Sequence, residues 1–141
     1  MAALKNIDGL YGLMTLVRVG GSLTQKLDSQ LSIYGMTYSE LMVLHHLASS
    51  PEKMLRRVDL ADAVSLTASG VTRMLKPMEK LGWVMKQANA RDARVSFVKL
   101  TDAGSDLYKD AFASVSDRSE MILGSITKHD KALILETLER V

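Results

Sequence analysis

Two short stretches of the chain combine cations with small or hydrogen-bonding residues. The first runs from Thr67 to Lys76 and includes Arg73, and the second is Arg91-Asp92-Ala93-Arg94. Small residues permit close approach, and a guanidinium donates in a planar fork that matches base edges and phosphates. In the second stretch Asp92 is close enough to hold the Arg94 guanidinium in place. A pre-positioned arginine loses less entropy on binding. Both stretches therefore suit contact with DNA.

The elements around these stretches form a recognisable order. A short helix is predicted over 58–64, a turn at 65–67 and a second helix over 68–81, which together make a helix-turn-helix. Thr67 is the predicted N-cap of the second helix, and Pro77 is expected to kink it or loosen its last turns. Strands follow at 83–85 and 95–100, joined by a polar tip over 87–94, so we predict a hairpin or wing. One helix of such a unit fits the major groove, and its N-terminal residues approach base edges.

Longer helices are predicted on both sides of this unit. A helix over 4–34 has a weak point at Gly20-Gly21 and a stop at Gly35. Thr37 and Glu40 match a capping box that opens a helix over about 38–49. Thr101 is expected to cap a helix over about 102–123, and Thr127 with Asp130 opens a last helix. The predicted fold class is mainly α (α+β), in one domain spanning 1–141.

Charge is distributed unevenly along the chain. Residues 51–100 hold ten Lys or Arg and five Asp or Glu, a net charge of +5. Residues 1–50 are neutral, and residues 101–141 carry a net charge of −3. A positive middle fits a module that meets a polyanion. The alternative is an ordinary scatter of solvated surface charges, in which Arg73 is a plain helix residue and Asp92–Arg94 a surface ion pair.

Composition argues against several classes of protein. The absence of Cys excludes a disulfide scaffold and a thiol nucleophile. No run approaches the ~20 apolar residues of a membrane helix, and the first residues fit a signal peptide poorly, so we expect a cytoplasmic protein. With three His and no nucleophile-base pair, we expect no enzyme, no metal and no cofactor. His45 and His46 point to different faces of their helix.

Several motifs at these positions resemble the MarR family of bacterial winged-helix regulators. The motifs are Leu60-Ala61, Val71-Thr72-Arg73-Met74-Leu75, Leu81-Gly82-Trp83-Val84, Arg91-Asp92-Ala93-Arg94 and Leu100-Thr101-Asp102-Ala103-Gly104. The pairing of an Asp-x-Arg wing with Leu-Thr-x-x-Gly is fairly specific. The resemblance implies a winged helix-turn-helix over 36–101, with dimerisation helices over 1–35 and 102–141. It also implies a homodimer on a pseudo-palindromic site in double-stranded DNA and, for many members, a small aromatic or phenolic effector.

The resemblance also implies roles for individual residues. Ser69, Gly70 and Arg73 are expected to face the major groove, and Arg94, oriented by Asp92, to enter the minor groove. Family wings often have Asp-Arg-Arg where this chain has Ala93, so one backbone contact is in doubt. The complete set of predicted DNA-contacting residues is Thr67, Ser69, Gly70, Thr72, Arg73, Lys76, Arg91, Asp92 and Arg94.

Three functions are weighed from the sequence. The preferred one is a dimeric, sequence-specific transcriptional regulator, of the repressor kind, with no membrane role. The alternative is a winged-helix protein-interaction module without DNA binding, which need not keep a basic middle or an arginine early in its second helix. The third, an enzyme, lacks a catalytic constellation.

Overall fold

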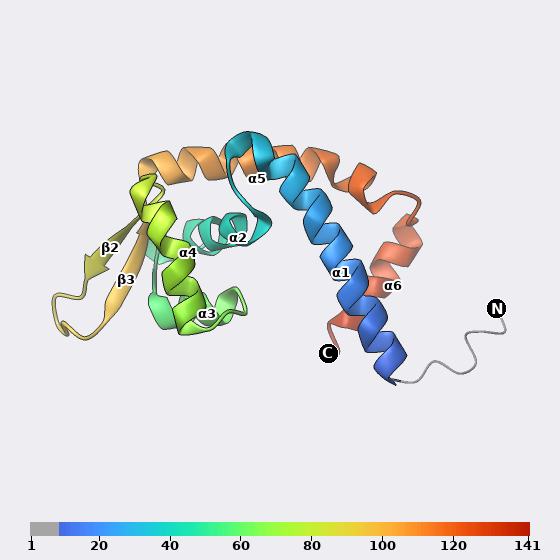
Figure 1. The fold of residues 1–141 in the computed structure, drawn as a ribbon, viewed down its shortest axis with the longest axis horizontal. Helices are drawn as coiled ribbons and strands as arrows, with labels where there is room; N and C mark the ends of the chain where they lie inside the picture. The colour runs from blue at the N-terminus through green and yellow to red at the C-terminus, as the bar shows by residue number, and fades with distance from the viewer. Residues whose placement is uncertain (1–8) are drawn as a thin grey trace.

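One long helix, α5, extends between two groups of elements that occupy opposite ends of the molecule (Figure 1). The computed structural model describes residues 9–141. Strands and short helices gather at one end of α5, and the first and last helices lie at the other. The helices are α1 (Gly9–Leu31), α2 (Tyr38–Ala48), α3 (Arg57–Ala63), α4 (Ala68–Lys80), α5 (Asp102–Leu123) and α6 (Lys128–Leu138). The mainly α fold predicted from the sequence is confirmed.

Helix boundaries follow capping residues that the sequence shows. Both oxygens of the Thr37–Glu40 capping box accept end amides of α2, as predicted. Thr127 and Asp130 form the same arrangement at the start of α6. Gly35 adopts φ 67°, a left-handed conformation that favours glycine, and ends the 3-10 turn η2 (Ser32–Tyr34) that follows α1. These caps fix where the chain changes direction.

The core lies where α2 meets α5, α3 and the sheet. Leu41, Leu44 and Leu47 of α2 are fully or almost fully buried, as their spacing predicts. The packed partners from the other elements are Leu31, Leu60, Val71, Leu75, Met78, Val98 and Ala111. This core holds the helix-turn-helix against the middle of the molecule.

The sheet has three antiparallel strands in the order β1-β3-β2. The predicted hairpin is confirmed as β2 (Val84–Ala88) and β3 (Ser96–Leu100), with Val84 opposite Leu100 and Ala88 opposite Ser96. The strand β1 (Met54–Arg56) is absent from the sequence prediction. It pairs with the other edge of β3, with Leu55 opposite Val98, and follows the 3-10 turn η3 (Pro51–Lys53).

Several local expectations differ from the structure. Helix α1 continues unbroken through Gly20-Gly21. Helix α4 includes Pro77, as predicted, and ends at Lys80, one residue before the predicted end. Leu81, the last residue of the predicted helix, lies instead at the C-cap of α4 and is 60% exposed. Trp83 precedes β2 rather than belonging to it, and β2 extends to Ala88. The predicted start of the first helix at residue 4 lies outside the described residues.

Candidate nucleic-acid interface

Helix α4 has one buried face and one face that carries cations. Val71, Leu75 and Met78 are fully buried against the core. The opposite face holds Ser69, Arg73, Lys76 and Lys80, all exposed and separated by three or four residues, so they form one stripe along the helix. Apolar residues on the other side fix the orientation of this stripe toward solvent.

The first turn of α4 is fixed by its cap. Thr67 accepts a hydrogen bond from the Gly70 amide at 3.0 Å, and its hydroxyl lies 3.3 Å from that of Ser69. The preceding Ser65 adopts φ 55°, a left-handed conformation that glycine adopts more easily. Thr67 and Ser69 are exposed and Gly70 is half-buried. The predicted contact residues of this turn therefore lie together at the exposed N-terminal end of the helix.

Thr72 differs from its neighbours because its hydroxyl is bonded within the protein. It donates to the Ala68 carbonyl at 3.0 Å and accepts from Nη1 of Arg57 at 2.9 Å. Thr72 is half-buried, and its contact with DNA stays a prediction. Arg57, the first residue of α3, was not among the predicted site residues. Its sequence signal is the Arg56-Arg57 pair just before the helix-turn-helix, but the partner on α4 is not visible in the sequence.

The tip of the wing is ordered by two short-range bonds. The Arg94 amide donates to Oδ1 of Asp92 at 3.0 Å, and Nε of Arg94 donates to the same oxygen at 3.2 Å. These bonds hold the pKa of the Asp92 carboxyl below its usual range, so it stays ionised as a partner for the guanidinium. The Arg94 side chain nevertheless remains 91% exposed. The Asp-x-Arg motif thus presents an oriented but accessible cation.

The Leu100–Gly104 motif fastens the base of the wing to α5. The Thr101 hydroxyl donates to the Gly82 carbonyl and accepts from the Gly104 amide at 3.0 Å, which caps α5. The Thr101 amide donates to the Trp83 carbonyl at 3.1 Å. A Cβ on Gly104 would lie 2.0 Å from that same carbonyl oxygen, so only glycine fits there. Wing and long helix are therefore joined without a flexible linker.

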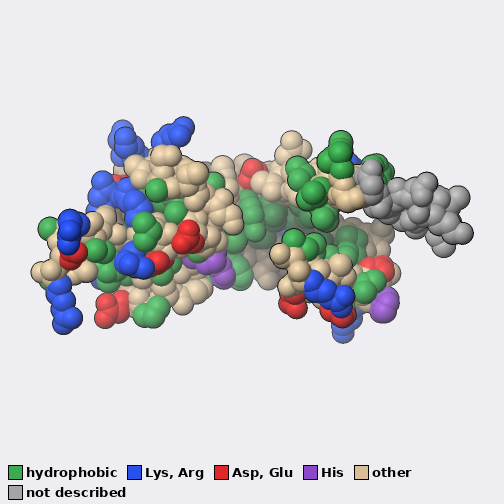
Figure 2. All heavy atoms as spheres, turned by 90° about the horizontal axis from the view of Figure 1, so that it is seen from below, with side chains coloured by type: hydrophobic (Ala, Val, Ile, Leu, Met, Phe, Trp, Pro, Cys, Tyr) green, Lys and Arg blue, Asp and Glu red, His purple; other side chains and the backbone are tan. Residues whose placement is uncertain are grey.

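The cations of this end of the molecule are largely free of acidic partners. Within residues 9–141, no carboxylate lies within 4.0 Å of Arg73, Lys76 or Arg91. Figure 2 shows Lys and Arg side chains gathered over the winged end of the molecule, while hydrophobic side chains gather over the other lobe. The α4 stripe and the wing therefore present cations without acidic partners, and such a surface is suited to a polyanion.

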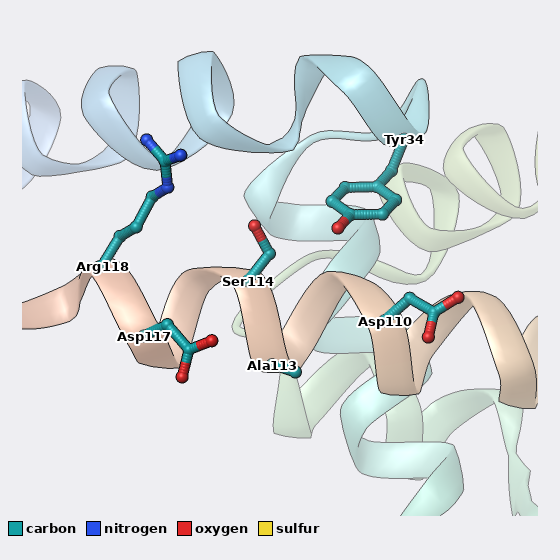
Figure 3. Close-up of a pocket in the computed structure, with 6 residues that line it drawn as sticks. All are labelled: Tyr34, Asp110, Ala113, Ser114, Asp117 and Arg118. Carbon is teal, nitrogen blue, oxygen red and sulfur yellow. The ribbon is translucent and has the colours of Figure 1, made fainter.

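Two pockets flank the connections between the two ends. The larger, of about 480 Å³, lies between Tyr34 and the α5 residues Asp110, Ala113, Ser114, Asp117 and Arg118. Figure 3 shows the Tyr34 ring pointing from η2 toward α5, with Ser114 and Arg118 directed toward the same space. The smaller, of about 240 Å³, is lined by Tyr38, Ser39, Met42, His46, Ala63, Val64 and Ser65, next to the turn of the helix-turn-helix.

An aromatic cluster joins α2 to α5 beside the core. Nδ1 of His45 lies 2.8 Å from the Tyr108 hydroxyl, and the His45 ring stacks on Phe112 with 5.5 Å between centroids. Burial raises the pKa of Tyr108, which keeps its hydroxyl protonated and able to donate.

The described residues contain no group of three or more His, Cys, Asp or Glu placed to hold a metal ion. None of the helices within residues 9–141 is long and apolar enough to cross a bilayer.

Comparisons with known proteins agree with this geometry. Residues 34–95 match the model of the MarR family. The HTH-type transcriptional repressor Rv2887 of Mycobacterium tuberculosis (strain ATCC 25618 / H37Rv) is 29% identical over 126 residues, which cover 89% of each chain. The uncharacterized HTH-type transcriptional regulator YdgJ of Bacillus subtilis (strain 168) is 26% identical over 107 residues, which cover 76% of this chain and 64% of that protein.

A solved structure extends the similarity to nearly the whole fold. The crystal structure of Sco3205, a MarR family transcriptional regulator from Streptomyces coelicolor in complex with DNA, superposes with a TM-score of 0.83 at 25% identity and covers 95% of this chain and 86% of that chain. Fold and surface together define a winged-helix protein of the transcription-regulator class. The chain resembles the MarR family over residues 34–95, and both the repressor Rv2887 and Sco3205 are transcriptional regulators.

Proposed function

We propose that this protein is a homodimeric, sequence-specific DNA-binding regulator that acts as a repressor on a pseudo-palindromic operator in the cytoplasm. The observation that carries the proposal is the exposed stripe of α4, whose cations have no acidic partner in the described chain, beside an exposed wing arginine that Asp92 orients. The Sco3205–DNA complex, from a similar protein, supports the same use of the fold. A protein-interaction module has no need of these unpaired cations.

In the proposed complex α4 lies in the major groove and the wing in the adjacent minor groove. Ser69, Gly70 and Arg73 contact base edges, since they lie on the first two turns of the helix that enters the groove. Arg94 enters the minor groove, where a narrow groove enhances the negative potential. The remaining contacts, to the DNA backbone or in support of these residues, are assigned to Thr67, Thr72, Lys76, Arg91 and Asp92.

The apolar surfaces of α1 and α6 support the homodimer. Leu10, Leu13, Met14 and Val17 recur at helical spacing on α1 and are each more than half exposed. Leu133 and Leu135 of α6 are also more than half exposed. Contiguous apolar surface of this kind is costly in water and marks an interface. A two-fold dimer through these helices sets two reading helices about 34 Å apart, the spacing of successive major grooves.

Release by a small aromatic effector is part of the proposal. The pocket beside His46 and Ser65 suits an aromatic anion better than the larger pocket, because the larger one is lined by two carboxylates, Asp110 and Asp117, and only one cation, Arg118. An effector shifts the protein only by binding one conformation better than the other. Benzoate added to a preformed DNA complex is expected to lower DNA affinity, and an unchanged affinity at saturating benzoate would contradict this part.

Selection of bound fragments from genomic DNA tests the central proposal. The purified protein is expected to enrich fragments that share an inverted repeat, and to shift them in gels with an affinity that falls steeply as salt rises. Enrichment of no common sequence, together with no binding to any duplex at low ionic strength, would rule out a DNA-binding regulator and favour the protein-interaction module.

A further inference from the structure

A pocket of about 260 Å³ separates the helix-turn-helix from the wing. It is lined by Arg56, Arg57, Val58, Arg94, Val95 and Ser96. One wall is formed where β1 ends and α3 begins, and the other wall is formed by the wing. The two walls are adjacent because Arg56 of β1 pairs with Phe97 of β3 in the sheet. Three of the six lining residues are arginines, and no carboxylate lines the pocket.

The three arginines differ in how much of their hydrogen-bonding capacity is used. Arg56 donates twice to Asp59, at 2.7 and 2.9 Å, and Arg94 is bonded to Asp92. Arg57 has no acidic partner within 4.0 Å in the described part of the chain. Its charge is therefore not neutralised by a neighbouring side chain.

Arg57 also holds an unsatisfied donor. Nη1 is bonded to Thr72 of α4, but Nε is buried and has no hydrogen-bond partner among the described residues. A buried donor without a partner is costly, and such a group in a folded protein calls for an acceptor that arrives with a ligand or with solvent. The ligand best matched to an arginine is an oxyanion, which accepts two parallel hydrogen bonds from the guanidinium fork.

Groove geometry identifies the oxyanion. If α4 occupies the major groove and the wing occupies the neighbouring minor groove, the sugar-phosphate strand that separates the two grooves passes between α4 and the wing. Arg57 lies between these two elements, since its Nη1 is bonded to Thr72 of α4 and its pocket is also lined by wing residues. We propose that Arg57 binds a backbone phosphate of this strand, an inference that rests on the proposed function. Thr72 positions the Arg57 guanidinium by accepting a hydrogen bond from Nη1.

Binding to a DNA duplex of mixed sequence tests this role without knowledge of the operator. Fluorescence anisotropy with a labelled duplex of about 30 base pairs, between about 50 and 200 mM salt, gives both affinity and salt slope. Arg57→Gln is expected to weaken binding roughly tenfold and to reduce the salt slope by about one. Arg57→Lys, which keeps the charge, is expected to retain the wild-type slope. Lys109→Gln, the same charge change on exposed α5, is the control and should alter neither quantity.

The alternative is a purely structural role for Arg57 in holding α3 to α4. Thr72→Val removes the internal bond and leaves the charge, so it should keep the wild-type salt slope. Unchanged affinity in Arg57→Gln would overturn the inference while the proposed function stands. The inference would also be overturned if Thr72→Val lost as much DNA affinity as Arg57→Gln and Arg57→Gln kept the wild-type salt slope. Failure of the wild-type protein to bind the duplex would instead refute the proposed function itself. Thermal melting identifies any variant that has not folded. If Arg57→Gln does not fold, the affinity of Arg57→Lys replaces it, because lysine keeps the charge but loses the guanidinium fork. Weaker binding by Arg57→Lys then supports the inference, and unchanged affinity overturns it.

Discussion

At the scale of single residues, the proposed interface divides into side chains that reach outward and side chains that hold them. Arg73 extends from the exposed face of α4, with no acid nearby in residues 9–141. Arg94 is exposed but oriented by Asp92, and Thr72 is bonded to Arg57. Reading a base depends on the first kind of residue, while the geometry of reading depends on the second.

Replacing Arg73 by alanine is expected to affect sequence recognition more than DNA binding in general. Arg73→Ala should cost about 1–3 kcal/mol on the selected operator, since it removes a contact to a base edge. Titration on operator and on mixed-sequence DNA measures the difference. Lys128→Ala, at the start of α6, is the control and should change neither. An equal loss on both duplexes would contradict base reading.

The wing arginine is expected to contribute to affinity without contributing to the fold. Arg94→Ala removes a side chain that is 91% exposed, so the thermal unfolding midpoint should stay within error of the wild type. Operator affinity should fall because the minor-groove cation is lost. Asp92→Ala should lower operator affinity by less, because it removes the bond that orients the Arg94 guanidinium but leaves the guanidinium itself in place. An unaltered gel shift for Arg94→Ala would reject the role of the wing.

At the scale of elements, the junction between wing and α5 depends on one glycine. Gly104→Ala places a Cβ 2.0 Å from the Trp83 carbonyl oxygen, and backbone on both sides must shift to relieve it. Overpacking of this kind is expected to lower the free energy of unfolding by about 1–3 kcal/mol. Urea unfolding measures the change. Asp106→Ala, at an exposed position of the same helix, should change it by less than about 0.5 kcal/mol.

Elements with local signals could be predicted from the sequence. Thr37 with Glu40 and Thr127 with Asp130 place two helix starts correctly, because a capping box is satisfied by residues three apart. The α4 cap at Thr67 and the hairpin follow from equally local patterns. The wing motif likewise places Asp92 next to Arg94, and the structure shows the predicted contact.

Features that depend on distant partners could not be predicted. Strand β1 has three residues, too few for a periodic pattern, and it exists because β3 offers a free edge. Arg57 was missed for the same reason, since its bond to Thr72 spans fifteen positions in the chain.

At the scale of the whole molecule, the two ends carry opposite kinds of surface. Cations without acidic partners gather on the winged end, and the exposed apolar residues of α1 and α6 lie at the other end (Figures 1 and 2). This separation allows a dimer to form through one end while both wings remain accessible. It also means that the proposed dimer and the proposed DNA contacts can be disrupted independently.

A charge placed on α1 is expected to dissociate the proposed dimer. Val17 is 72% exposed in the single chain, and Val17→Asp would bury a carboxylate at the interface. Sedimentation equilibrium should then give the mass of one 15.5 kDa chain, against twice that mass for the wild type. Met85→Asp, a similar change on β2 of the wing, should leave the mass unchanged. A wild-type protein that sediments as a single chain would refute the dimer.

The stiff coupling of α5 has a mechanical consequence. Its 22 residues span about 33 Å, and its start is pinned to the wing by Thr101 and Gly104. A lever of that length turns a tilt of about 5° at one end into a displacement of about 3 Å at the other. In the proposed dimer, a slight adjustment where the two copies meet would therefore move both winged ends by enough to take them out of register with a fixed groove spacing, with no rearrangement inside either winged end.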